Sequence, residues 1–244
     1  MPTYSLDEQR WIDRGIQMIN VEINNDVAYI ELNDGKANVF SPAMIEQFNQ
    51  ALDRAEAEAK VVVIRGSGDK FSAGFDLSIV KQGGEAQWGM VLSGFELLLR
   101  LYKHPQPLIS AVAGHALGMG AFTLLVSDTR IGAEGDYKLG LPETAANMQF
   151  TDFLVAILKA ELNPMSMNSA ALQSQLCNPK SALKAGFLDL LVPDDQLNAT
   201  ADKAAQGLMQ LPAKQYAHNK LELREDDIAI MTSRLNALHA MLSK

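Results

Sequence analysis

The fold is decided by residues 109–148, which read ISAVAGHALGMGAFTLLVSDTRIGAEGDYKLGLPETAANM. The short apolar run over 109–112 predicts a buried strand, and the longer apolar run over 121–126 predicts a buried helix. Glycines separate the two runs, and two more short strands are expected after the helix. A strand that enters a helix through glycines leaves unpaired backbone N–H groups, which favour negative charge. We therefore expect an oxyanion site here, with Glu143 as the nearest downstream acid.

Strands alternate with helices along the chain before this stretch. Two runs rich in β-branched residues, Ile16 to Ile23 and Val27 to Leu32, predict a hairpin. Ser41 followed by Pro42 predicts the start of a helix, and Val61 to Ile64 predicts another buried strand. This alternation predicts an α/β fold with mostly parallel strand pairing.

The end of the chain predicts helices. Further expected elements are a helix over 89–103, a short helix opened by Asn178 and Pro179 and closed by Gly186, a strand over 187–192, and helices over 195–211, 213–223 and 225–244. We expect three parts: an N-terminal extension over 1–15, an α/β core over 16–192, and a C-terminal helical region over 193–244.

Composition excludes several classes of function. The chain has 244 residues, of which 48% are hydrophobic, so it can bury a full core. Its net charge of −8 argues against binding to nucleic acid. Cys177 is the only cysteine, and no pair of histidines has metal-ligand spacing with an acid, so neither a disulfide framework nor a metal site is expected. The absence of a signal-peptide pattern or a membrane-spanning stretch predicts a cytoplasmic protein.

A second glycine corner, FSAGFDL over 71–77, also follows a predicted buried strand. If the two corners lie side by side, each offers a backbone N–H to one point, which is the arrangement of an oxyanion hole. The alternative is that both are ordinary turns between a strand and a helix. Other glycine motifs fit less well: Thr123 stands where a dinucleotide fingerprint needs its third glycine, and neither a GK[ST] nor a G-x-S-x-G motif is present.

These two corners carry a family resemblance. FSAGFDL and AVAGHALGMGAFTLLVSDTRIG (111–132) resemble the two signature segments of the crotonase (enoyl-CoA hydratase/isomerase) superfamily. NDGKANVFSPAMIEQF (33–48) is similar to the first CoA-binding turn and helix of that family, and NPKSALKAGFLDLLVP (178–193) to the segment before its C-terminal helices. The likeness covers most of the chain, and the combined spacing is much more specific than any one motif.

The resemblance implies a spiral of β-β-α units followed by helices that trimerise, often into a dimer of trimers. It implies an acyl-CoA thioester as substrate, with CoA as part of that substrate and no permanently bound cofactor. The enolate would be held by the backbone N–H groups of Phe75 and Met119. The residues implied to contact the substrate or CoA are Ala37, Asn38, Val39, Ser72, Ala73, Asp76, Leu77 and Ser78.

The resemblance also indicates which of the family's reactions to expect. Hydratases of the family use two glutamates, and the position of the first is occupied here by Phe122, which would line a dry acyl pocket. Glu143 matches the second glutamate. One carboxylate can remove a proton from carbon and return it two carbons away, so the pattern favours a Δ3-to-Δ2 enoyl-CoA isomerase. Hydration with one acid, and CoA-ester binding with little turnover, stay open as alternatives.

Several site residues also have simpler interpretations. A glutamate after proline at a helix start is commonly a solvated residue of the first turn, which is the alternative for Glu143. Asp76 is expected to cap the next helix, and His115 to serve in packing or hydrogen bonding. Met119 stands where the family commonly has glycine, so its N–H can serve as a donor only if its φ stays negative.

Overall fold

The computed structural model describes residues 17–242. The expected extension over 1–15 therefore lies outside the described residues, as does Ile16. The strands are β1 (Ile19–Asn24), β2 (Val27–Leu32), β3 (Val61–Gly66), β4 (Lys70–Ser72), β5 (Leu108–Val112), β6 (His115–Leu117), β7 (Thr129–Ala133), β8 (Leu139–Gly140) and β9 (Leu190–Val192).

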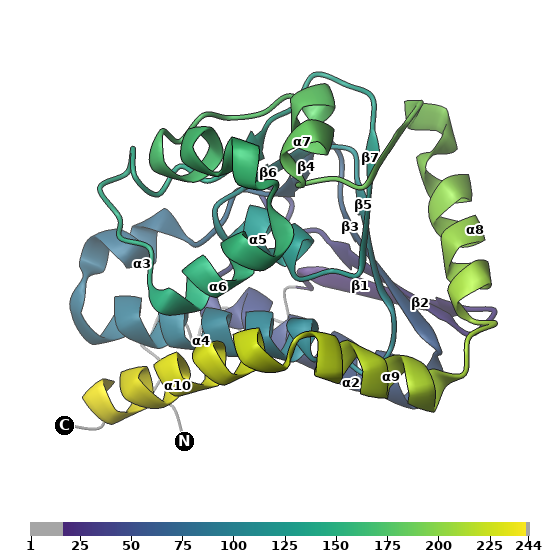
Figure 1. The fold of residues 1–244 in the computed structure, drawn as a ribbon, viewed down its shortest axis with the longest axis horizontal. Coiled ribbons are helices and arrows are strands. Elements are labelled where there is room, and N and C mark those ends of the chain that lie inside the picture. The colour runs from purple at the N-terminus through teal and green to yellow at the C-terminus, as the bar shows by residue number, and fades with distance from the viewer. Residues whose placement is uncertain (1–16, 243–244) are drawn as a thin grey trace.

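Helices connect and cover these strands (Figure 1). They are α2 (Pro42–Glu58), α3 (Leu77–Gln82), α4 (Gly84–Tyr102), α5 (Met119–Leu125), α6 (Asp152–Glu161), α7 (Pro179–Ala185), α8 (Leu197–Leu208), α9 (Ala213–Leu223) and α10 (Glu225–Leu242). The expected helix over 89–103 begins earlier, at Gly84, and α6 was not expected from the sequence. Ser41 caps α2 as predicted, because its side chain accepts a hydrogen bond from the Met44 N–H.

A six-stranded sheet forms the centre of the fold in the order β1-β2-β3-β5-β7-β9. β1 and β2 pair antiparallel, which confirms the predicted hairpin, and the other neighbours pair parallel. Asn25 and Asp26 join the hairpin with positive φ angles of 49° and 64°, the conformation that a tight two-residue hairpin turn requires.

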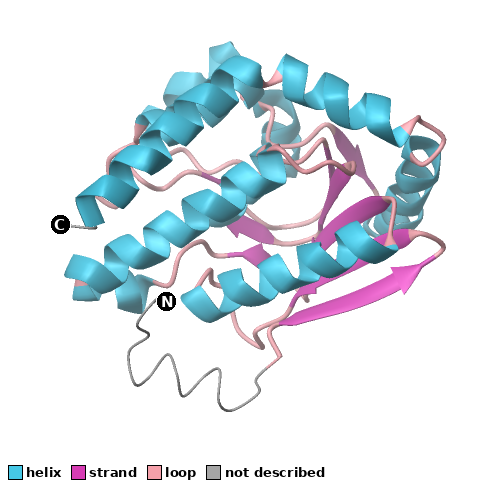
Figure 2. Ribbon diagram, turned by 90° about the horizontal axis from the view of Figure 1, so that it is seen from below, coloured by secondary structure: helices cyan, strands magenta, loops and turns pink. Residues whose placement is uncertain are grey.

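Both faces of this sheet are covered. β3 shows the alternation: Val61 and Val63 belong to the apolar cluster that packs against α8, whereas Val62 and Ile64 belong to the main core on the other face. Because both faces are buried, β3 reads in the sequence as a continuous apolar run. Figure 2 shows helices on both sides of the strands.

A second, smaller sheet was not expected from the sequence. It consists of β4, β6 and β8, which pair parallel in that order. The chain three times runs from a strand of the large sheet to a strand of the small sheet and then to a helix: β3-β4-α3, β5-β6-α5 and β7-β8-α6. This repeat is the spiral of β-β-α units that the family resemblance implied.

The C-terminal helices fold back onto the rest of the described chain. α8 packs on the large sheet through Leu197, Ala201 and Ala205, and α10 packs along α4 and α6. Leu235 and Leu238 are buried, in agreement with the predicted apolar face of α10. α8 and α10 therefore complete the core of the same chain.

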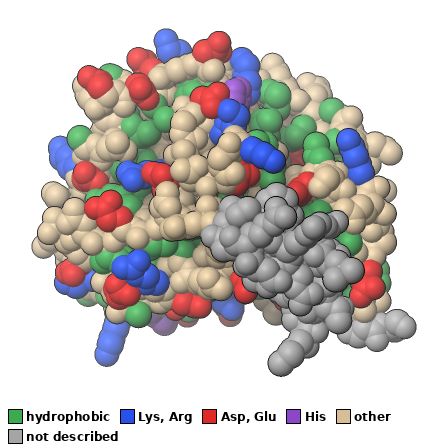
Figure 3. Space-filling view, turned by 180° about the vertical axis from the view of Figure 1, so that it is seen from behind, with side chains coloured by type: hydrophobic (Ala, Val, Ile, Leu, Met, Phe, Trp, Pro, Cys, Tyr) green, Lys and Arg blue, Asp and Glu red, His purple; other side chains and the backbone are tan. Residues whose placement is uncertain are grey.

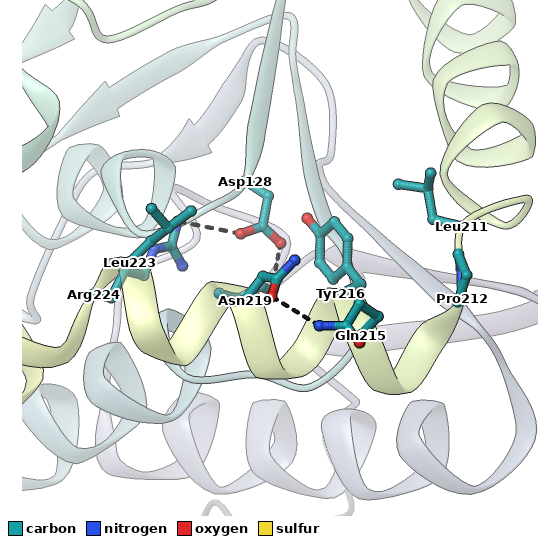
Figure 4. A pocket seen from close by; sticks show the side chains of 9 residues that line it. Asp128, Leu211, Pro212, Gln215, Tyr216, Asn219, Leu223 and Arg224 are labelled. Atoms are coloured by element: carbon teal, nitrogen blue, oxygen red, sulfur yellow. Dashed lines mark hydrogen bonds and ion pairs between the residues drawn. The ribbon is translucent and has the colours of Figure 1, made fainter.

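A buried cluster of charges fixes α9 to the core. Both oxygens of Asp128 are paired: Lys220 Nζ lies 2.6 Å from Oδ2, and an Arg224 guanidinium nitrogen lies 3.2 Å from Oδ1 (Figure 4). The Leu108 N–H donates to the same carboxylate, which ties the cluster to the start of β5. A cavity of about 380 Å³ adjoins Asp128 and α9, and its charged side chains are paired with one another.

Charge is mixed on the surface that Figure 3 shows. Basic side chains are interspersed with acidic ones on this face, and they form no basic stripe there. None of the described helices is long and apolar enough to cross a membrane.

The Asp128 cluster yields a stability prediction. Asp128→Asn leaves Lys220 buried, with its side chain 5% exposed, and without its anionic partner. We expect the free energy of unfolding to fall by about 3 kcal/mol, as for other broken buried pairs. Urea denaturation measures the loss, and Glu58→Gln is the control because its pair with Arg54 is about half exposed. The control should cost less than about 0.5 kcal/mol, and equal losses in the two variants would contradict the account.

Candidate active site

The candidate site lies at the carboxyl ends of the three strands of the small sheet. The turn over 73–76 follows β4, the Gly118 corner follows β6, and Glu143 lies three residues after β8. The two glycine corners thus do not follow strands of the large sheet directly, as the sequence had suggested. They are neighbours because β4 and β6 are paired in parallel, so that both strands end at the same edge.

The first turn orients the N–H of Phe75. The Phe40 N–H donates to the Gly74 carbonyl oxygen at 2.8 Å, and the Asp76 N–H donates to the Phe40 carbonyl oxygen at 3.4 Å. Successive N–H groups of an extended chain point to opposite sides, so the N–H of Phe75 points away from Phe40. Within residues 17–242 no hydrogen-bond acceptor is found for this N–H.

The second turn presents the N–H of Met119. Gly118 has a φ of +53°, which turns the chain sharply into α5, and no side chain caps that helix. Met119 is the first residue of α5 and is not among the residues with positive φ, so the condition for its N–H to act as a donor is met. Its N–H likewise has no acceptor in the described part of the chain.

Gly74 shows how closely the two turns approach. A Cβ atom added there would lie 3.4 Å from the backbone nitrogen of Met119 and 2.9 Å from the carbonyl oxygen of Leu117. Its φ of +94° is also a conformation that favours glycine. Two small turns packed this tightly bring two free N–H groups into one region, where they could stabilise negative charge on a ligand oxygen.

Glu143 is held beside the second turn. The Gly118 N–H donates to the Gly140 carbonyl oxygen at 3.0 Å, which fixes the corner to the strand that leads to Glu143. A Cβ atom added at Gly118 would lie 3.4 Å from Oε1 of Glu143. Oε2 is buried and has no hydrogen-bond partner among residues 17–242. Burial raises the pKa of Glu143 from 4.5 to about 7.

The solvated alternative for Glu143 is wrong. The residue is only 9% exposed, and residues 143–147 form turns rather than the first turn of a helix. The carbonyl oxygen of Glu143 accepts from the N–H groups of Ala146 and Met148, so the local backbone curls around it. A buried carboxyl group with one free oxygen and a pKa near 7 can exchange a proton with a ligand at neutral pH.

The residues expected to contact CoA lie along two adjoining segments. The Ala73 N–H donates to the Ala37 carbonyl oxygen at 2.9 Å, which joins the loop over 37–39 to the first turn. Ser72 is fully buried, and its hydroxyl accepts from the Gly74 N–H, so its side chain shapes the turn. Ala73, Leu77 and Ser78 are exposed, Ala37 and Val39 are partly exposed, and Asn38 is buried.

Asp34 is a structural residue that sequence reasoning missed. Its carboxylate accepts hydrogen bonds from the N–H groups of Lys36, Asn38 and Val39. Asn38 in turn accepts from the Asp34 N–H and donates to the carbonyl oxygens of residues 70 and 71, which belong to β4. The signal was the density of Asn, Asp and Gly in NDGKAN, which is typical of side-chain-stabilised turns.

Other predicted residues have clear places. Asp76 caps α3, as predicted, by accepting from the Ser78 N–H at 2.8 Å. His115 also has the predicted hydrogen-bonding role, because its Nδ1 accepts from the Lys138 N–H. Phe122 is buried on α5, with 1% of its surface exposed. Within residues 17–242, no three His, Cys, Asp or Glu side chains are placed to hold a metal ion.

Comparison with known families decides the assignment. The model of the enoyl-CoA hydratase/isomerase family matches residues 22–241. The chain belongs to this family. The family is one of enzymes, and the match confirms the resemblance that the two glycine corners carried.

Individual relatives agree with the family assignment. A putative enoyl-CoA hydratase from Thermus thermophilus is 31% identical over 201 residues, which are 78% of each chain. The crystal structure of an enoyl-CoA hydratase/isomerase family protein from Pseudomonas syringae has 31% identity and a TM-score of 0.88, covering 90% of this chain and 96% of that one. Human mitochondrial delta3-delta2-enoyl-CoA isomerase has 26% identity and a TM-score of 0.87, covering 93% and 91%. The crotonase fold is thereby confirmed, while both hydratases and isomerases occur among the relatives.

The burial of Glu143 yields a prediction about stability and pH. The pKa is about 7 in the folded protein and 4.5 for the free side chain, so the fold loses stability as the pH rises from 4.5 through 7. At about 1.4 kcal/mol for each pH unit, the loss is on the order of 3 kcal/mol. The side chain of Glu143→Gln cannot ionise, so the variant does not lose this stability. The unfolding free energy of the variant minus that of the unchanged protein should therefore increase by this amount between pH 4.5 and pH 8.

Urea denaturation of the unchanged protein and of Glu143→Gln, at several pH values, measures this difference. Parallel stability curves across the range would mean that the Glu143 carboxyl group is not desolvated in the folded protein. Glu134→Gln is the matched control, because Glu134 is an exposed glutamate nearby in the chain and should leave the pH dependence unchanged.

Proposed function

We propose that this member of the family is a single-glutamate enoyl-CoA isomerase that moves a double bond from Δ3 to Δ2. The observation that carries the proposal is Oε2 of Glu143, which is buried, free of hydrogen bonds and part of a carboxyl group with a pKa of about 7. A carboxylate of this kind is a better base near neutrality than a solvated glutamate.

The reaction requires one base and one oxyanion site. Glu143 would remove a proton from C2 of the 3-enoyl thioester, and the electron pair would delocalise onto the thioester oxygen. The free N–H groups of Phe75 and Met119 would stabilise that enolate oxygen. Glu143 would then return the proton to C4, so that the C2–C3 double bond forms as the C3–C4 double bond is lost.

Phe122 supports isomerisation over hydration. In the resemblance it stands at the position of the first hydratase glutamate, and a phenyl ring can neither accept a proton nor orient water. Phe122 is buried, and its N–H donates to the carbonyl oxygen of Gly118, the residue that precedes α5. If Phe122 lines the acyl pocket, as the resemblance implies, it would keep that pocket dry and so favour the raised pKa of Glu143.

The test is a kinetic assay with 3-enoyl-CoA substrates of several chain lengths, followed by the absorbance of the conjugated thioester. We expect kcat/KM to rise with pH through about 7 as Glu143 ionises. Glu143→Gln should lose at least about a hundredfold of the rate, whereas Glu134→Gln should retain it. No product at any chain length would contradict the proposal, and rapid loss of crotonyl-CoA by hydration would favour the hydratase alternative.

We also propose that the C-terminal helical region over 193–244 mediates assembly into a homotrimer or a dimer of trimers. Support comes from the family resemblance and from large apolar side chains that are exposed on and beside α9 and α10: Leu211, Leu221, Leu223, Ile230 and Met241. Leu223 is the most exposed of these, at 86%. Exposed apolar side chains that gather into one continuous patch are typical of surfaces that meet another chain.

Sedimentation velocity at micromolar concentration tests the assembly. We expect a trimer or hexamer, and Leu223→Asp should shift the distribution towards monomer because it places a charge where an apolar contact is proposed. A stable monomer of the unchanged protein over this concentration range would contradict the proposal.

A further inference from the structure

Gly94 lies in the interior of α4, where a glycine weakens a helix and therefore calls for a packing reason. A Cβ atom added there would lie 2.5 Å from both Cε1 and Cζ of the Phe75 ring, and 3.5 Å from Cε of Met119. Carbon atoms in contact normally stay at least about 3.5 Å apart. An alanine at this position would therefore collide with the Phe75 ring.

The two side chains that meet Gly94 belong to the two residues with free N–H groups. Phe75 lies in the turn after β4 and Met119 in the turn after β6, so side chains from both turns lie against Gly94, although only the Phe75 ring is too close to allow a methyl group there. The Phe75 ring packs against the main core, and Met119 is 2% exposed. Phe75 is partly buried, whereas the Met119 side chain has little room to move because protein interiors are close-packed. A methyl group added at Gly94 would therefore displace the Phe75 ring.

We propose that Gly94 is a positioning residue of the oxyanion site: its lack of a side chain lets Phe75 seat against α4, which sets the distance between the two N–H donors. The inference rests on the proposed function, because it gives Phe75 and Met119 their roles as donors. The inference about Gly94 adds that helix α4, which contributes no donor itself, determines whether both N–H groups reach one oxygen.

The chain provides a matched control in the same helix. Gly89 also lies in α4, but a Cβ atom added there would meet no atom within 4 Å. Gly89→Ala should raise the melting temperature, since alanine favours the helix, and it should leave the site unchanged. Gly94→Ala makes the same chemical change five residues later, where the added methyl group meets Phe75.

Two measurements distinguish an effect of Gly94→Ala on the position of the N–H donors from an effect on folding. The first is the infrared stretch of a ¹³C-labelled thioester carbonyl in bound butanoyl-CoA, which is saturated and does not react. Two donors on the oxygen should move the stretch to lower frequency in the unchanged protein and in Gly89→Ala. Gly94→Ala should lose much of that shift. The second is turnover: kcat of Gly94→Ala should fall about 10- to 100-fold, as for a misplaced catalytic group, with KM changed less than about threefold.

A rescue variant makes the test specific. Phe75→Leu keeps the backbone N–H but lacks the ring atoms that an alanine at position 94 would meet. In the Gly94→Ala background this second change should restore most of the carbonyl shift and of kcat, a non-additive result expected only for residues in contact. The double variant also carries the test if Gly94→Ala alone does not fold.

The outcomes distinguish the inference from the function on which it rests. A carbonyl shift in the unchanged protein that Gly94→Ala retains, with unchanged kcat, would overturn the role of Gly94 alone. A folded double variant that lacks the shift would do the same. Bound butanoyl-CoA without any shift in the unchanged protein would overturn the oxyanion site, and the role of Gly94 with it.

Discussion

The parallel pairing of β4, β6 and β8 decides where the parts of the candidate site lie. Each of these strands has only two or three residues, yet their carboxyl ends supply the first turn, the second turn and the acid in that order. The hydrogen bond from the Gly118 N–H to the Gly140 carbonyl oxygen ties the second turn to the strand that leads to Glu143. Without this small sheet, the large sheet alone would not bring residues so distant in the chain together.

The site combines groups whose burial is unfavourable when they are unpaired. Among the described residues, two N–H groups lack acceptors and Glu143 keeps one buried oxygen without a partner. Such groups weaken a fold unless the surrounding structure holds them firmly. Here that support comes from the close approach at Gly74, from the turn around Asp34 and Asn38, and from fully packed helices on both faces of the sheet.

Much of the fold could be predicted from local sequence signals. Ser41 with Pro42 marked the start of α2, and Asn178 with Pro179 marked α7, since capping depends on a few adjacent residues. The strands of the large sheet were visible as apolar runs. Of the small sheet, β8 corresponds to the second of the two short strands expected after α5. β4 and β6 were not visible, because three residues are too few to show a periodicity of two.

Parts of the candidate site could likewise be predicted from the sequence, and other parts could not. The two turns were predicted from their glycines, which the backbone requires because Gly74 and Gly118 have positive φ angles. The choice of Phe75 and Met119 as donors came from the family resemblance. The burial of Glu143 could not be predicted from the local sequence, because residues from other parts of the chain exclude its solvent, and the pattern Pro142-Glu143 favoured exposure. Only the family resemblance implied a dry site for this residue. The role of Gly94 was also invisible, since only the folded chain places α4 against both turns.

The most direct test of the central claim is a crystal structure of the protein with a bound acyl-CoA. The account predicts that the thioester oxygen lies within hydrogen-bond distance of the backbone nitrogens of both Phe75 and Met119, with the Glu143 carboxylate facing C2 of the acyl chain. A thioester oxygen that contacts neither nitrogen, or a Glu143 carboxylate turned away from the acyl carbons, would contradict it.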